Sequence, residues 1–221
     1  MSGRSAHWLG LLLLAMLCGG CASTSEGAVN PALFPRTDVA ATSRVPGRVA
    51  VLVSPQVRAT VHDPMREVRI NVRLPIGRVV EQAVLVALGD AALGGVLGVE
   101  ALPSAGSGFD ATVVVDAVRA GYHRRLKMLL PAPPPLFLVG DDELEARLAF
   151  DLSLLDAQGR KVWTRTYDAG TAIVNRPSIW RAETPDDLVA LAHATAWRLS
   201  QQMVTDLRDW LVAERNKPRE L

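Results

Sequence analysis

The chain has 221 residues, with 24 Lys plus Arg, 23 Asp plus Glu and two cysteines, and this length suits one domain with short flanking segments. The balance of charge argues against a nucleic-acid partner, because proteins that bind nucleic acids carry a strongly basic face. Two cysteines are also too few for a disulfide framework once one of them is removed with the amino-terminal segment.

The amino-terminal segment over residues 1–20 has the layout of a secretory signal peptide. Arg4 precedes an apolar run over residues 8–17, and two glycines directly precede Cys21. A transmembrane helix needs roughly 20 apolar residues to cross ~30 Å of hydrocarbon, and this run is shorter. We therefore expect residues 1–20 to be removed. Since Arg4 leaves with them, the mature chain holds 23 basic and 23 acidic residues.

The sequence LGLLLLAMLCGGC over residues 9–21 resembles the lipobox of bacterial lipoproteins. The resemblance implies diacylglyceryl transfer to the thiol of Cys21, cleavage before this residue and acylation of its new amine. Several acyl chains anchor a protein stably, whereas a single chain binds a membrane only marginally. Ala22 and Ser23 stand where an aspartate would signal inner-membrane retention, which implies the outer membrane. The alternative is a plain signal peptide in which Cys21 occurs by chance.

Residues 21–47 are rich in small residues, Ser, Thr and Pro, and have no sustained hydrophobic period. This composition is typical of an extended tether that spaces a domain from its anchor. Residues 29–34 are apolar enough for part of this segment to pack on the domain.

Two strand signals and one helix signal follow. Residues 48–53 predict a buried strand, and the alternating residues 57–62 and 67–74 predict a hairpin. Arg69 and Arg73 on its charged face are either solvated or part of a patch for an anionic headgroup or partner. Apolar residues at helical spacing then predict an amphipathic helix over residues 78–97 with a glycine-rich end. That end is not a phosphate-binding loop, because it follows a helix and lacks the required Lys and Ser or Thr.

A strand over residues 110–119 leads into a small basic cluster and then into the apolar insert 128–139, which contains four prolines. Proline excludes regular helix and central strand from this insert. Either it folds back as a lid over its own sheet, or it presents an apolar tip to a bilayer or protein, flanked by basic residues that meet anionic groups. The candidate partner-contact or lipid-contact residues are Arg124, Arg125, Lys127, Leu136, Phe137 and Leu138.

The remaining chain predicts a hairpin and a long helix. Residues 145–154 and 161–174 alternate around the turn DAQG. Thr184 is a natural N-cap and Pro185 suits the first turn, so a helix is expected over residues 184–213. One apolar stripe follows this helix: Leu188, Ala192, Thr195, Leu199, Met203, Leu207 and Trp210. Residues 214–221 form a charged tail.

The mature chain shows no catalytic signature. His62, His123 and His193 have no metal-ligand spacing, and no nucleophile motif is present. We expect His193 to be a surface or partly packed residue rather than a base. Trp163, Trp180, Trp197 and Trp210 are expected in the core or at an interface edge. The sequence therefore predicts no metal, no cofactor and no enzyme.

The predicted fold is α+β, with a mostly antiparallel sheet carrying two helices on one face in a single periplasmic domain over residues 48–213. This element order and the lipobox resemble small outer-membrane lipoproteins of the YajG type and, more loosely, the LptE-like and ABC-transport-auxiliary lipoproteins. The resemblance implies a non-enzymatic accessory protein that binds an envelope partner from the periplasmic side of the outer membrane. The alternative is a lipid- or glycolipid-handling auxiliary subunit of an envelope transport system, and an envelope enzyme comes third.

Overall fold

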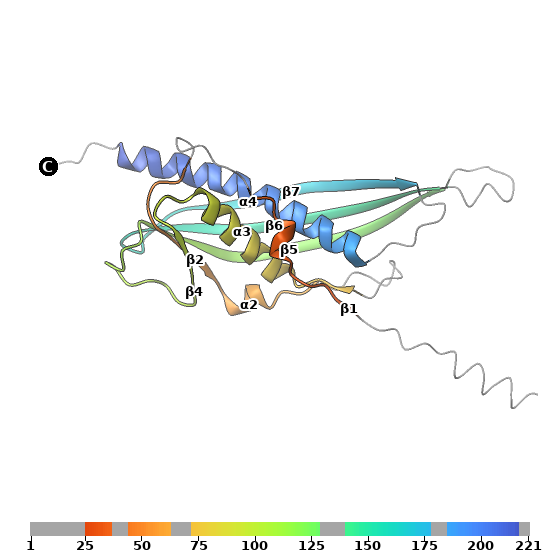
Figure 1. The fold of residues 1–221 in the computed structure, drawn as a ribbon, viewed down its shortest axis with the longest axis horizontal. Coiled ribbons are helices and arrows are strands. Elements are labelled where there is room, and N and C mark those ends of the chain that lie inside the picture. Colours follow the sequence, from red (N-terminus) through yellow and green to blue (C-terminus); the bar gives the residue numbers. More distant parts are fainter. Residues whose placement is uncertain (1–24, 37–43, 63–71, 129–139, 178–184, 217–221) are drawn as a thin grey trace, which may run out of the picture.

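The computed structural model describes residues 25–36, 44–62, 72–128, 140–177 and 185–216. Within them, a five-stranded sheet has the strand order β4-β2-β5-β6-β7 (Figure 1). Its strands are listed here in chain order: β2 (Val49–Val53), β4 (Val96–Val99), β5 (Ala111–Met128), β6 (Gly140–Asp156) and β7 (Lys161–Pro177). The α+β class is therefore as the sequence predicts.

The sheet is mixed, which corrects the expectation of a mostly antiparallel sheet. β2 lies parallel to both β4 and β5, whereas β5, β6 and β7 form an antiparallel meander. The parallel part arises because helix α3 (Ile76–Ala91) lies between β2 and β4 in the chain. A helical crossover brings the chain back to the end of the sheet at which the first strand began. The next strand therefore runs in the same direction as the first.

The meander confirms the hairpin that alternation predicts around DAQG. Residues on β6 pair with β7 from Leu155 opposite Lys161 to Asp141 opposite Pro177. Both β5 and β6 extend well beyond the predicted strands, since β5 continues to Met128 and β6 begins at Gly140. The basic cluster that the sequence places after a strand therefore lies within β5.

Two helices cover one face of the sheet. α3 and α4 (Pro185–Arg215) lie side by side, with α3 over β2 and β5 and α4 over β6 and β7 (Figure 1). The predicted stripe of α4 is confirmed, because all its members except the half-buried Trp210 are buried. The buried side of α3 consists of Ile76, Gly77, Val79, Val80, Ala83, Val84, Ala87, Leu88 and Ala91.

The segment predicted as the first arm of a hairpin, residues 57–62, begins instead inside a short helix, α2 (Pro55–Arg58). The Ser54 side chain accepts a hydrogen bond from the Val57 backbone N–H, and Pro55 occupies the first turn. An N-cap followed by proline favours a helical turn over the weak alternation of so short a segment. Of the predicted hairpin, the described residues keep one antiparallel bridge, between His62 and Leu74. Residues 63–71 lie outside the described residues.

The predicted helix over residues 78–97 is too long at its carboxyl end. α3 ends at Ala91, and the following apolar residues form β4 as an edge strand. The helix stops where Ala92 adopts an extended conformation, with φ −80° and ψ 126°. Gly95, with a φ of 86° that favours glycine, then lies in the turn before β4. The apolar sequence after it then pairs with β2.

The described amino-terminal residues pack on the domain. β1 (Ser25–Glu26) pairs in parallel with β3 (Val72–Arg73), and the 3₁₀ turn η1 (Pro31–Leu33) contacts both α3 and α4. We call residues 25–34 the N-terminal strap. The prediction that part of residues 29–34 packs on the domain is confirmed by Phe34, which is 3% exposed.

Candidate functional site

The predicted contact residues divide between described and undescribed segments. Cys21, Leu136, Phe137 and Leu138 lie outside the described residues. Arg124, Arg125 and Lys127 occupy the last part of β5. These three positions are therefore the part of the predicted contact set that the structure places in an element.

The register of β5 shows how the basic positions are arranged. Side chains alternate between the two faces of a strand, so position 124 belongs to one face and positions 125 and 127 to the other. Arg125 lies opposite Glu143, and Lys127 lies opposite Asp141. In the backbone register, Arg125 and Lys127 thus stand opposite acidic residues of β6, whereas Arg124 stands opposite Leu144.

The N-terminal strap joins the amino-terminal residues to β3, α3 and α4. The Gly27 backbone N–H donates to the Arg73 carbonyl oxygen at 2.8 Å. A Cβ atom at Gly27 would lie 3.0 Å from side-chain atoms of both Leu74 and Val189. Because that spacing is tighter than ordinary van der Waals contact, the strap approaches α4 as closely as a glycine allows.

His193 on α4 holds the other end of the strap. The Asn30 backbone N–H donates to its Nε2 atom at 3.2 Å, and its Nδ1 atom lies 2.7 Å from the Val189 carbonyl oxygen. The Phe34 ring lies 5.0 Å from the imidazole and 5.9 Å from the Trp197 ring, measured between centroids. Burial lowers the pKa of His193. His193 is thus a buried packing and hydrogen-bonding group, more fully packed than the surface or partly packed position that the sequence predicts.

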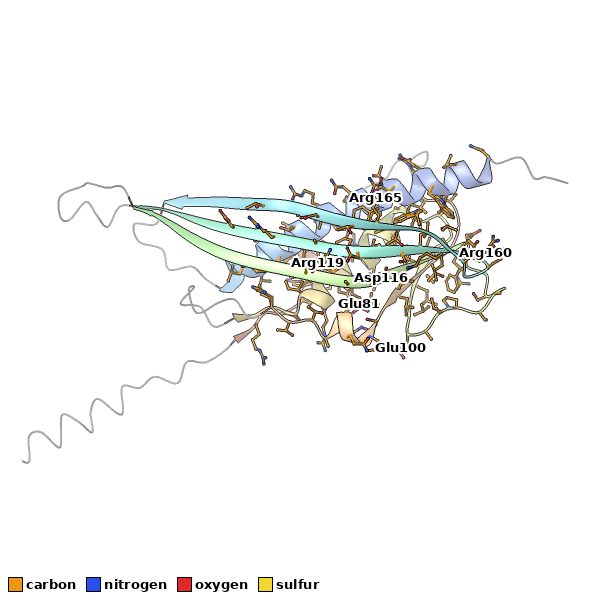
Figure 2. The ribbon with its side chains drawn as sticks, turned by 180° about the vertical axis from the view of Figure 1, so that it is seen from behind. Glu81, Glu100, Asp116, Arg119, Arg160 and Arg165 are labelled. Carbon is orange, nitrogen blue, oxygen red and sulfur yellow. The ribbon has the colours of Figure 1, made fainter. Side chains whose placement is uncertain are left out.

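The face of the sheet that the helices leave uncovered carries a polar network (Figure 2). Arg119 forms a two-bond ion pair with Asp151, with N···O distances of 2.6 and 2.8 Å, and Thr166 donates to the same carboxylate. The guanidinium and hydroxyl hold the pKa of Asp151 below its usual value. On the same face, Ser153 donates to Asp116. These bonds link the side chains of β5, β6 and β7 across the uncovered face.

A second polar group lies where the edge strand β7 meets α4. The Tyr167 hydroxyl donates to Asp206 at 2.8 Å, and Arg165 pairs with the same carboxylate at 2.8 Å. Burial, followed by the hydrogen bond to Asp206, raises the pKa of Tyr167. The Tyr167 hydroxyl and the Arg165 guanidinium thus tie β7 to α4 through one carboxylate.

Shallow depressions lie beside these elements, including one of about 420 Å³ at Tyr167 and Asp206 and two others. One, of about 540 Å³, runs between the strap and α3 and is lined in part by Arg78 and Glu81, the latter paired with Arg58. The other, of about 370 Å³, lies on the uncovered face beside Arg119 and Arg147. In the described ranges, no group of three His, Cys, Asp or Glu residues gathers as a metal site. Nor is any described helix long and apolar enough to cross a membrane.

The sequence predicts that part of residues 29–34 packs on the domain, but not that His193 is its contact. His193 and Phe34 lie 159 positions apart, and no local pattern links them. The prediction for tryptophan holds where the structure describes it, because Trp163, Trp197 and Trp210 are partly buried and pack against the core. Trp180 lies outside the described residues.

No protein-family model matches the chain, and a search of the curated proteins found no match. Solved structures similar to this chain include an uncharacterized lipoprotein B from Nitrosomonas europaea, at 13% identity and a TM-score of 0.41, covering 80% of this chain and 94% of that one. A Xanthomonas campestris protein of the DUF330 family is 16% identical, covers 88% and 97%, and has a TM-score of 0.37. A minor lipoprotein from Acinetobacter baumannii is 13% identical, covers 79% and 99%, and has a TM-score of 0.32. At these scores, function must be argued from the chain's own residues.

Proposed function

We propose that the protein is a lipoprotein anchored at Cys21 to the periplasmic side of the outer membrane, where it acts as a non-enzymatic accessory protein that binds an envelope partner. The observation that carries this proposal is the amino-terminal sequence, in which two glycines and Cys21 directly follow a short apolar run. Acylation of the thiol and the new amine of Cys21 would supply the several chains that a stable anchor needs.

The docked strap supports a position close to the membrane. Ser25 lies four positions after Cys21, and an extended chain spans at most about 3.5 Å per residue, or about 14 Å here. β1 lies in the half of the molecule toward which the β5–β6 hairpin points (Figure 1). A lipid anchor at Cys21 would therefore hold this half, with the ends of β5 and β6, nearest the bilayer.

The polar groups of the described residues favour binding over catalysis. The carboxylates of Asp151 and Asp206 are each engaged by an arginine and by a hydroxyl. For Asp151 this pairing holds the pKa below its usual value, so the carboxylate is a weak general base. We accordingly assign partner or lipid contact to the residues around the β5–β6 hairpin, which are Arg124, Arg125, Lys127, Leu136, Phe137 and Leu138.

The test is chemical crosslinking in intact cells, followed by purification and mass spectrometry of what remains attached. A variant with Leu136, Phe137 and Leu138 all changed to Ser should lose the envelope proteins that the unaltered chain recovers. A matched variant with the exposed Leu93, Leu97 and Leu102 changed to Ser should retain them. Equal recovery from all three proteins would contradict the contact assignment. Bound lipid without any protein partner would favour the lipid-handling alternative.

A further inference from the structure

The protonation state of His193 is determined by its two neighbours. The Val189 carbonyl only accepts, so Nδ1 must carry the proton of the 2.7 Å hydrogen bond. The Asn30 backbone N–H only donates, so Nε2 must present a lone pair at 3.2 Å. Only the neutral imidazole, protonated at Nδ1, makes both contacts at once. If Nε2 also carried a proton, two N–H donors would face each other and the hydrogen bond from Asn30 would be lost.

The strap is what encloses this imidazole. His193 is 1% exposed, and Phe34 lies over it at 5.0 Å. The Asn30 side chain accepts from the Ala32 backbone N–H at 3.0 Å, which shapes the turn that brings Phe34 to the helix. The hydrogen bond, the ring contact and the turn are therefore coupled, and losing one weakens the others.

We propose that the N-terminal strap is a releasable latch, docked on α4 while His193 is neutral and released when His193 takes up a proton. Release lengthens the free chain between the anchor and the domain, a consequence that rests on the proposed lipidation of Cys21. Among the described residues after the strap, Val45 is buried and its N–H donates to the Ala91 carbonyl oxygen.

The change in reach is large. With the strap docked, Ser25 lies four positions from Cys21, which corresponds to at most about 14 Å. With the strap released, Val45 lies 24 positions from Cys21, which corresponds to about 80 Å fully extended. As a flexible coil the same chain has an end-to-end distance of about 27 Å. A domain held against the bilayer would thereby reach partners farther into the periplasm.

The direction of the pH dependence follows from the surroundings of His193. The strap contributes Asn30 and Phe34 and α4 contributes Val189 and Trp197, none of which ionises. Burial lowers the pKa of His193, and no charged group among the described residues contributes to that shift. Once released, the imidazole regains its ordinary pKa of about 6.5. The released state then binds the proton more tightly, so docking is complete above about pH 6.5 and weakens as pH falls below it.

Hydrogen–deuterium exchange of the full mature chain tests the latch. Backbone amides of residues 27–34 are compared at about pH 7.5 and about pH 5.5, after correction for the intrinsic exchange rate, and their protection should fall about tenfold. Amides of residues 148–154 in β6 serve as the internal reference and should not change. Unchanged protection of the strap at the lower pH would overturn the proposal.

Three variants separate the latch from general loss of structure. His193→Gln retains an acceptor but does not titrate, so strap protection should become independent of pH. Phe34→Ala should leave the strap unprotected at both pH values, whereas Leu33→Ala, at a residue 42% exposed in the same turn, should behave as the unaltered chain. A pH-dependent strap in His193→Gln would contradict the mechanism. Hydrogen–deuterium exchange of Cys21→Ser measures release of the strap in a chain without the lipid anchor. Failure of the latch proposal is therefore distinguishable from failure of the proposed lipidation.

Discussion

At the scale of single residues, Leu199 reports whether α4 is a core element. It is 1% exposed and belongs to the buried stripe that packs toward the sheet and α3. Leu199→Ala should lower the free energy of unfolding by about 2–5 kcal/mol, because the lost contacts leave a cavity. Urea denaturation measures this change. Gln202→Ala, at an exposed position on the same helix, is the control and should have little effect. Similar small losses at both positions would mean that the stripe is a partner surface.

A second residue-scale prediction concerns the ion pair on the uncovered sheet face. Arg119 and Thr166 lower the pKa of Asp151, so its carboxyl signal in NMR should titrate below the ordinary value of about 3.9. Arg119→Gln should move that midpoint upward. A depressed pKa contributes stability above the unfolded value and loses it as pH falls through the folded value. Since the Arg119 and Asp151 side chains are 57% and 24% exposed, this contribution should stay under about 1 kcal/mol. A midpoint that is unaffected by Arg119→Gln would contradict the pairing.

At the scale of elements, two glycines of α3 should respond in opposite ways to alanine. A Cβ atom on Gly77 would overlap the carbonyl of Val57, whereas one on Gly89 would meet nothing within 4 Å. Gly89→Ala should stabilise the protein by up to about 1 kcal/mol, because alanine restricts the unfolded chain and favours helix. Gly77→Ala should destabilise it by displacing α2 from α3. Thermal unfolding of the pair measures both, and a stabilised Gly77→Ala would show that α2 does not pack there.

Hydrophobic period predicts the long elements well and the short ones poorly. The meander and α4 each carry many residues on one pattern, so individual exceptions do not obscure the signal. α2 and β4 have four residues each, too few to show a period. The cap formed by Ser54 and Pro55 is a recognisable local signal for α2, but the choice of β2 as the partner of β4 is made by tertiary packing and leaves no trace in the local sequence.

The candidate site was only partly accessible from sequence for a similar reason. The proposed signal peptide and lipobox are local patterns, so the sequence before Cys21 is enough to predict them. The latch joins Asn30 and Phe34 to His193 on the last helix, and that contact depends on the whole fold. Likewise, the basic residues of β5 form one cluster in sequence, yet strand alternation divides them between two faces.

At the scale of the whole molecule, the strap relates the anchor to the domain. It joins β3 at one end and lies across α3 and α4 at the other, so the described amino-terminal residues are part of the folded body (Figure 1). The point from which the chain leaves toward Cys21 is consequently fixed relative to the sheet. Such an arrangement orients an anchored domain, which a fully flexible tether does not do.

Mass spectrometry of the mature protein isolated from cell membranes tests the central claim most directly. We expect an amino terminus at Cys21 whose thiol carries diacylglycerol and whose amine carries an acyl chain. Cys21→Ser should abolish membrane fractionation, whereas Cys18→Ser should not, because Cys18 lies in the segment 1–20 that we expect to be removed. An unmodified Cys21, a different amino terminus, or a Cys21→Ser protein that still fractionates with the outer membrane would contradict it.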